Sequence, residues 1–194
     1  YHARAMGNPL RDRRTAAEWA SVGQVIEITE KISAFDRLSE IVEADLAALD
    51  VDRIPAEWRE STVCGALQFG FPQQAGGTPV VTGQVTVAVD AVCQRCLEPF
   101  RLQLHIEPRL LLAKDDESID EFDDFEVWEL ENETLRPLDV VEELLIMAMP
   151  FAATHDNMAE CKAFSTVDAV ATDMKRPFAG LAEQMKQVEK DPGN

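Results

Sequence analysis

The sequence has few residues of several kinds, and each shortage argues against a class of protein. No stretch of about 18 consecutive apolar residues occurs, so no membrane-spanning helix is predicted. Basic residues are half as many as acidic ones, 18 against 36, and the formal net charge is −18. Such a charge repels a phosphate backbone, so a non-specific DNA-binding protein is not expected. The charge favours a basic partner, or a contact with nucleic acid that is confined to a local basic patch.

The motifs of common enzyme classes are also missing. The sequence has no glycine-rich phosphate-binding loop, no Ser/His/Asp arrangement, and no His-x-Glu upstream of a Pro-Cys-x-x-Cys as in zinc deaminases. Residues 1–14 contain charges with no apolar run after them, which argues against a secretory signal peptide. Four cysteines without such a signal indicate a reducing compartment, where a Cys-x-x-Cys pair is more often metal-binding or redox-active than structural.

The residues that are present predict one α+β domain. A chain of 194 residues, 46% of them apolar, is long enough to bury a core without disulfides. Alternating β-branched runs predict strands, and a 3.6-residue apolar period predicts helices. The strands are expected over residues 24–29, 61–71, 80–93 and 100–112, and the helices over residues 15–20, 33–49 and 137–149. Ser33 and Pro137 are the expected N-cap and first helical residue of the last two helices.

We therefore predict a twisted antiparallel β-sheet, with a barrel-like form left open, and with helices packed on it. The domain is expected over residues 15–172 and includes an acidic segment, 115–133, with eleven acids, no base and room for one strand. Residues 1–14 are interpreted as a flexible basic arm, in which 1–5 are a candidate tag remnant. Residues 173–194 are expected to form a C-terminal amphipathic helix and tail.

One motif suggests a metal site. Cys93-Gln-Arg-Cys96 lies between the two strands of a predicted hairpin, which is the form of a metal knuckle. A second pair of zinc ligands could come from His155 and Cys161. Redox-active pairs usually open a helix, whereas Leu97–Phe100 does not. A metal site, a set of reduced and partly buried thiols, and a redox pair all remain open. Cys64, in a predicted strand, is expected to be a small buried residue.

Charged residues supply two further sets of candidates. Basic residues could contact RNA or a partner at a local patch, and acidic residues could bind a basic partner. The basic candidates are Arg11, Arg13, Arg14, Arg95, Arg101, Lys175 and Arg176. The acidic candidates are Asp115, Asp116, Glu117, Asp120, Glu121, Asp123 and Asp124. Arg95, between two cysteines of a turn, is expected to point outward.

Three blocks of the sequence together resemble the bacterial YceD family of large ribosomal RNA subunit accumulation proteins. They are VTVAVDAVCQRCLEPFRLQL, LDVVEELLIMAMPFAATHDNMAEC and KRPFAGLAEQMK. The matching positions are Cys93, Arg95, Cys96, Leu97, Pro99, Phe100, Val141, Glu142, Glu143, Ala148, Pro150, His155, Cys161, Pro177, Phe178 and Leu181. Two departures, Arg136 in place of Asp and Leu144 in place of Glu, affect the acidic helix face.

The resemblance implies a cytoplasmic, non-catalytic factor in the synthesis, processing or stability of large-subunit ribosomal RNA. Some relatives have Cys where this chain has His155, an exchange between two zinc ligands, which implies a structural Zn²⁺ bound by Cys93, Cys96, His155 and Cys161. Genes of this family often lie next to a gene for a small ribosomal protein of the large subunit. The hypotheses are thus a factor that contacts ribosomal RNA or a pre-ribosomal particle, an acidic escort for a basic ribosomal protein, and, as the weakest, a thiol-disulfide oxidoreductase.

Overall fold

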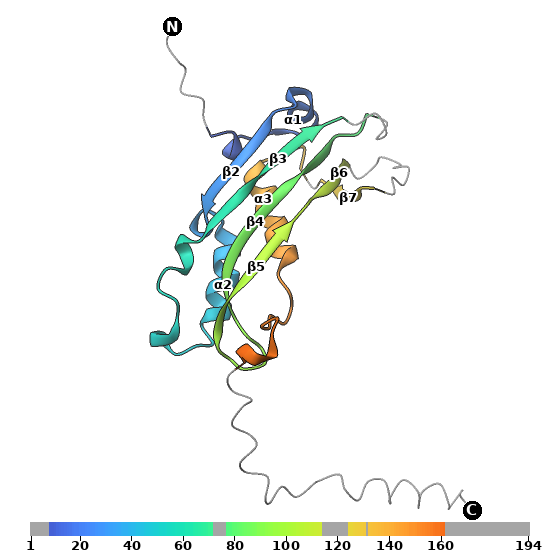
Figure 1. Cartoon of the computed structure of the whole chain (residues 1–194). Helices are drawn as coiled ribbons and strands as arrows, with labels where there is room; N and C mark the ends of the chain where they lie inside the picture. The colour runs from blue at the N-terminus through green and yellow to red at the C-terminus, as the bar shows by residue number, and fades with distance from the viewer. Residues whose placement is uncertain (1–7, 72–76, 114–123, 131, 162–194) are drawn as a thin grey trace, which may run out of the picture.

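The computed structural model describes residues 8–71, 77–113, 124–130 and 132–161 (Figure 1). Its strands are β1 (Arg14–Thr15), β2 (Val25–Lys31), β3 (Thr62–Gly70), β4 (Val80–Val92), β5 (Pro99–Ile106), β6 (Arg109–Ala113), β7 (Glu126–Glu129) and β8 (Thr134–Leu135). Its α-helices are α1 (Ala16–Val22), α2 (Asp36–Leu46) and α3 (Pro137–Ala148). The short 3₁₀ turns are Pro9–Arg11, Ile32–Ala34, Val51–Arg53, Trp58–Glu60 and Met158–Glu160. The α+β fold predicted from the sequence is confirmed, and no described helix is long and apolar enough to cross a membrane.

The main sheet has the order β2-β3-β4-β6-β7, with β5 also paired to β4. Neighbouring strands are antiparallel except β6 and β7, which are parallel and were not predicted to be so. In the described ranges the sheet stays open, so the barrel-like form is not adopted. β1 and β8 form a separate two-stranded sheet. The strand expected inside the acidic segment 115–133 is β7, whereas residues 114–123 lie outside the described residues.

β5 and β6 are two parts of one long strand that pairs with β4. Ile106 pairs with Val85 and Arg109 with Thr82, so the register runs through the interruption at Glu107 and Pro108 unchanged. Proline has no N–H to donate, which explains why the ladder breaks there. The predicted hairpin is confirmed, and its turn, residues 93–98, lies at one end of β4, the longest strand of the described residues (Figure 1).

The core lies between one face of this sheet and the helices. Alternate strand residues such as Ile26, Leu67 and Val85 are buried and cluster with Val42 of α2 and Leu145 of α3. Each such side chain contributes about 1.5–3 kcal/mol by leaving water. Cys64 lies on the opposite face of β3 from the buried residues of that strand and is exposed. The prediction of a buried Cys64 was therefore wrong, because alternation along the strand places its side chain on the outer face.

Two helix starts illustrate local and tertiary capping. Thr15 caps α1 together with Glu18 in a reciprocal capping box, a signal contained in the sequence itself. Ser33 was expected to cap the second helix but lies in a 3₁₀ turn, and α2 begins at Asp36. The free N–H groups of α2 are instead satisfied by α3, as described below, so the predicted cap was wrong.

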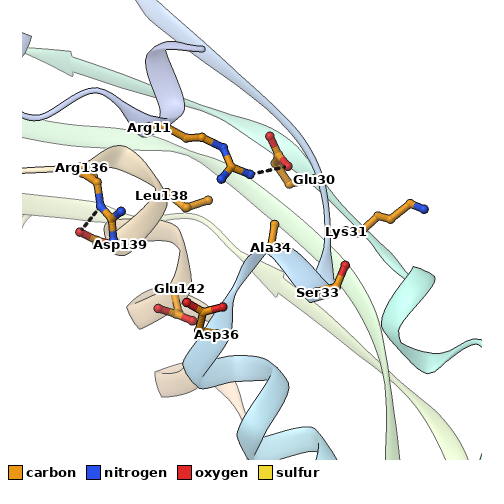
Figure 2. Close-up of a pocket in the computed structure, with 10 residues that line it drawn as sticks. All are labelled: Arg11, Glu30, Lys31, Ser33, Ala34, Asp36, Arg136, Leu138, Asp139 and Glu142. Carbon is orange, nitrogen blue, oxygen red and sulfur yellow. Dashed lines mark hydrogen bonds and ion pairs between the residues drawn. The ribbon is translucent and has the colours of Figure 1, made fainter. Parts of the chain in front are cut away.

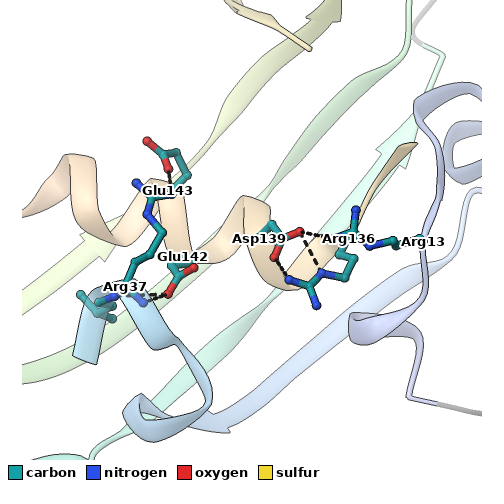
Figure 3. A network of polar contacts seen from close by, with 7 residues as sticks. Arg13, Arg37, Arg136, Asp139, Glu142 and Glu143 are labelled. Carbon is teal, nitrogen blue, oxygen red and sulfur yellow. Dashed lines mark hydrogen bonds and ion pairs between the residues drawn. The ribbon is translucent and has the colours of Figure 1, made fainter. Parts of the chain in front are cut away.

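Glu142 of α3 accepts hydrogen bonds at the N-terminus of α2 (Figure 3). Its Oε1 lies 2.8 Å from the backbone nitrogen of Arg37 and 3.2 Å from that of Leu38. The neighbouring Glu143 forms an ion pair of 2.6 Å with the Arg37 guanidinium. Two acids of the helix 137–148 thus hold the two helices together on the sheet, and the carboxylate complements the positive end of the α2 dipole.

Candidate metal centre

The turn between β4 and β5 holds two thiols in one place. The backbone N–H of Leu97 donates to the carbonyl of Cys93 at 2.8 Å, and that of Cys93 donates to the carbonyl of Glu98 at 2.9 Å. Leu97 closes the turn in the left-handed region, with φ of 58°. Cys93 and Cys96 are both buried. The knuckle predicted from the Cys-x-x-Cys spacing is therefore formed at the end of the hairpin.

The second pair of residues comes from the segment that follows α3. The backbone N–H of Gln94 donates to the carbonyl of Ala153 at 2.8 Å, which joins this segment to the knuckle. A 3₁₀ turn then begins after Asn157, whose side chain accepts from the N–H of Ala159 at 3.0 Å. The turn ends at Cys161, whose thiol is buried at the knuckle.

The four ligand atoms of Cys93, Cys96, His155 and Cys161 all lie within 4.8 Å of one another. Sγ of Cys93 and Sγ of Cys161 are 3.9 Å apart. Nδ1 of His155 lies 3.6 Å from Sγ of Cys96 and 3.4 Å from Sγ of Cys161. Tetrahedral zinc with ordinary bond lengths would require about 3.8 Å between sulfurs and about 3.5 Å between sulfur and nitrogen. The expected convergence is confirmed, and the donors fit a zinc ion.

The thiols have unequal affinities for protons. Burial raises the pKa of Cys93, but hydrogen bonds from the backbone N–H groups of Cys96, His155 and Arg95 outweigh it and lower the pKa to about 5. Burial and the neighbouring Cys93 and Cys96 raise the pKa of Cys161. Without a bound cation, loss of the proton from the Cys161 thiol, which would give a second thiolate beside Cys93, is therefore unfavourable. A bound divalent cation would remove this opposition, since it stabilises thiolates directly.

Residues outside the Cys-x-x-Cys motif position the site. The ring of Phe100 lies 4.7 Å from that of His155, measured between centroids. The guanidinium of Arg53 donates to the carbonyl of Leu97 at 3.2 Å and to the carboxylate of Glu98 at 2.6 Å. Asp45 accepts from the N–H of Val92, immediately before the knuckle, at 2.7 Å. Arg53 and Asp45 lie far from the motif in sequence, and no local pattern marks them.

Arg95 does not point outward as expected. It is half-buried, and its Nη1 lies 3.8 Å from Sγ of Cys161. The turn tucks this side chain against the second ligand pair because residues 153–161 pack beside it. The guanidinium thereby contacts the ligand cluster at the thiol of Cys161.

The other basic candidates are paired with acids rather than gathered in a patch. Arg101 lies 2.9 Å from the buried Asp90, and Arg11, Arg13 and Arg14 lie 3.4, 3.9 and 3.2 Å from Glu30, Asp139 and Asp12. In the described ranges, every Lys or Arg except Arg95 has a carboxylate within 3.9 Å. These ranges thus contain no cluster of free cations suited to phosphate.

Several candidate residues fall outside the described part of the chain. They are Lys175, Arg176, Asp115, Asp116, Glu117, Asp120, Glu121 and Asp123, together with the predicted helix in 173–194 and residues 1–5 of the arm. Asp124 is described, is exposed, and lies 3.8 Å from the guanidinium of Arg109.

Comparison with models of known protein families identifies a match to this chain. The model of the family described as large ribosomal RNA subunit accumulation protein YceD matches residues 81–191. No curated protein and no solved structure in the comparisons gives a significant match. The matched region begins in β4, spans more than half of the 194 residues, and includes Cys93, Cys96, His155 and Cys161. The chain therefore belongs to the YceD family.

Proposed function

We propose that this protein acts in the cytoplasm as a non-catalytic binding factor for the accumulation of large-subunit ribosomal RNA. Membership of the YceD family supports a role in that process. We further propose that Cys93, Cys96, His155 and Cys161 bind a structural zinc ion that ties the segment after α3 to the hairpin. Zinc would supply fixed geometry there, and no residue of the cluster is assigned a chemical step.

The distribution of charge favours a cationic protein as the direct partner. The net charge is −18, and the basic side chains of the described residues are paired with carboxylates, as shown above. Such a surface repels phosphate and attracts the cationic proteins of the large subunit, and complementary charge also speeds their encounter. We propose that the protein escorts a basic large-subunit protein, and that the RNA accumulates because its assembly with that protein is supported.

Direct contact with ribosomal RNA is the second candidate. One observation favours it: Arg95, at the knuckle, has no carboxylate partner among the described residues. A guanidinium in that position could bind a phosphate if its contact with Cys161 opened.

A pull-down at two salt concentrations, with and without RNase, separates the two candidates. The escort mechanism predicts recovery of one basic large-subunit protein that resists RNase and falls as salt rises. Recovery of large-subunit RNA that disappears with RNase would support direct RNA contact instead. If neither is recovered and the purified protein reduces disulfides, the binding function is wrong.

A further inference from the structure

A groove separates α3 from the strands β6 and β7. Its volume is about 810 Å³, within the range of ligand-binding clefts. Its apolar lining includes Leu110, Leu112, Trp128 and Leu144, together with the exposed side chain of Met147. Met147 is 68% exposed, whereas Val127 pairs with Leu111 and lies on the other face of the sheet. Large apolar side chains that remain exposed beside a groove are typical of a binding site.

The charged residues that line the groove are mainly acidic. Three carboxylates on the α3 side, those of Glu126, Asp139 and Glu143, face two guanidinium groups, those of Arg13 and Arg37, and Glu129 follows on the other face of β7. Both guanidinium groups are already engaged, Arg13 with Asp139 at 3.9 Å and Arg37 with Glu143 at 2.6 Å (Figure 3). Among the described residues, Glu126 and Glu129 have no basic partner. The groove therefore combines apolar surface with carboxylates that are available to cations.

The edge of the sheet at the groove is also available. β7 is the last strand of the order β2-β3-β4-β6-β7, and in the described part of the chain its outer edge has no strand beside it. Its exposed backbone groups could pair with an added extended segment. In sequence, β7 directly follows the acidic residues 115–124.

A second pocket, of about 440 Å³, lies on the other side of the α3 N-terminus and is a weaker candidate (Figure 2). Its charged residues pair mainly with one another, Arg11 with Glu30 at 3.4 Å and Arg136 with Asp139 at 2.5 Å. Its lining has little apolar surface, with Leu138 and Ala34 as the apolar residues. It therefore offers neither apolar anchoring nor unpaired charge on the scale of the groove.

We propose that the groove between α3 and β7 binds a cationic polypeptide segment that also bears apolar side chains, presented by a basic large-subunit protein. This inference rests on the proposed escort function and assigns its binding site. RNA does not fit, because the carboxylates of the groove outnumber its guanidinium groups and both guanidinium groups are already paired. A segment with basic residues alone would leave the side chain of Met147 in water, so apolar side chains are required for tight binding.

Fluorescence anisotropy of three labelled probes tests the proposal with the full chain. The probes are a peptide of Lys and Arg alternating with Leu and Phe, a peptide of equal length and charge with Ser in place of Leu and Phe, and a single-stranded RNA. We expect the first peptide to bind at least about tenfold more tightly than the second, because it alone fills the apolar surface. We expect no saturable binding of the RNA.

Substitutions test whether the first peptide binds in the groove. Met147→Arg adds a cation to the groove and should weaken binding of the first peptide by about tenfold or more. Val51→Arg is the matched control, because Val51 is 87% exposed in a turn that does not line the groove, and it should bind like the wild type. Met147→Ser, which adds no charge, should weaken binding in the same direction, and circular dichroism verifies that each variant folds. Glu126→Gln with Glu129→Gln should weaken binding about threefold to tenfold at low salt and less at high salt.

Three results would overturn the proposal. The first is wild-type binding of the first peptide by Met147→Arg. The second is saturable RNA binding that Met147→Arg alters. The third is a gain of about tenfold in peptide affinity on deletion of residues 173–194, since the groove would then be the site of the chain's own C-terminal segment. These assays test the binding site, and the pull-down described under the proposed function tests the escort function. If variants changed in the groove still recover the basic protein in the pull-down, only the assigned site is wrong.

Discussion

Cys161 joins the segment after α3 to the knuckle between β4 and β5. Its thiol lies 3.9 Å from that of Cys93, and the regular structure between α3 and Cys161 is one short 3₁₀ turn, Met158–Glu160. A segment with so little regular structure depends on the ligand cluster for its position. A single residue can therefore decide whether the segment after α3 stays at the knuckle.

We predict that Cys161→Ser destabilises the protein strongly. Loss of a metal ligand is among the few changes that lower the free energy of unfolding by about 3–5 kcal/mol. Cys64→Ser is the matched control, because Cys64 is exposed on β3, and its effect should stay within about 0.5 kcal/mol. Urea unfolding of the two variants measures the difference. Equal stability of both variants would mean that Cys161 has no structural role.

The acidity of Cys93 gives a second prediction at this scale. Its pKa in the folded protein is about 5, well below the ordinary value of 9.0. A group whose pKa is lowered by folding contributes stability that is complete above its ordinary pKa and is lost as pH falls through the folded pKa. In metal-free protein we therefore expect stability to decline from about pH 9 to about pH 5, and the ultraviolet absorbance of the thiolate to disappear near pH 5. Cys93→Ser should remove the absorbance change, and a change that persisted in this variant would assign the thiolate elsewhere.

Helix α2 depends on helix α3 for its N-terminal cap. Because Glu142 accepts from the N–H groups of Arg37 and Leu38, Glu142→Ala should lower the free energy of unfolding by about 1–2 kcal/mol, the usual cost of a lost cap. Glu40→Ala, on the exposed surface of α2, is the control and should change it by less than about 0.5 kcal/mol. Thermal unfolding of both variants tests this, and equal midpoints would show that water replaces the cap without loss.

Elements with a local signal could be predicted from the sequence, and those fixed by distant partners could not. Alternation located β2 to β5, and Pro137 marked the start of α3. The start of α2 was missed because its cap, Glu142, lies about a hundred residues away, and the parallel pairing of β6 and β7 has no local signature. At the site, the four ligands were found by combining a half-knuckle with a family resemblance. Arg53, Asp45 and the inward turn of Arg95 follow from packing between segments, which periodicity does not encode.

The excess of acidic residues in the whole molecule leads to a prediction about partner binding. Changing Asp115, Asp116, Glu117, Asp120 and Glu121 to Asn and Gln removes five of the 36 acids. If the partner is a basic protein, this change should weaken binding by more than about tenfold at low salt, and the loss should shrink at high salt. Pull-down of the RNase-resistant partner measures it. Unchanged binding would exclude this acidic segment from the interface, and the melting temperature shows whether the fold is retained.

The zinc centre proposed at Cys93, Cys96, His155 and Cys161 should hold one zinc ion. Its most direct test is the metal content and zinc-edge X-ray absorption spectrum of the purified full chain after dialysis. The geometry predicts about one zinc per chain, with three sulfur ligands near 2.3 Å and one nitrogen ligand near 2.0 Å. A folded chain that contains no metal after expression with ample zinc, or a zinc ion whose shell lacks sulfur, would contradict the claim.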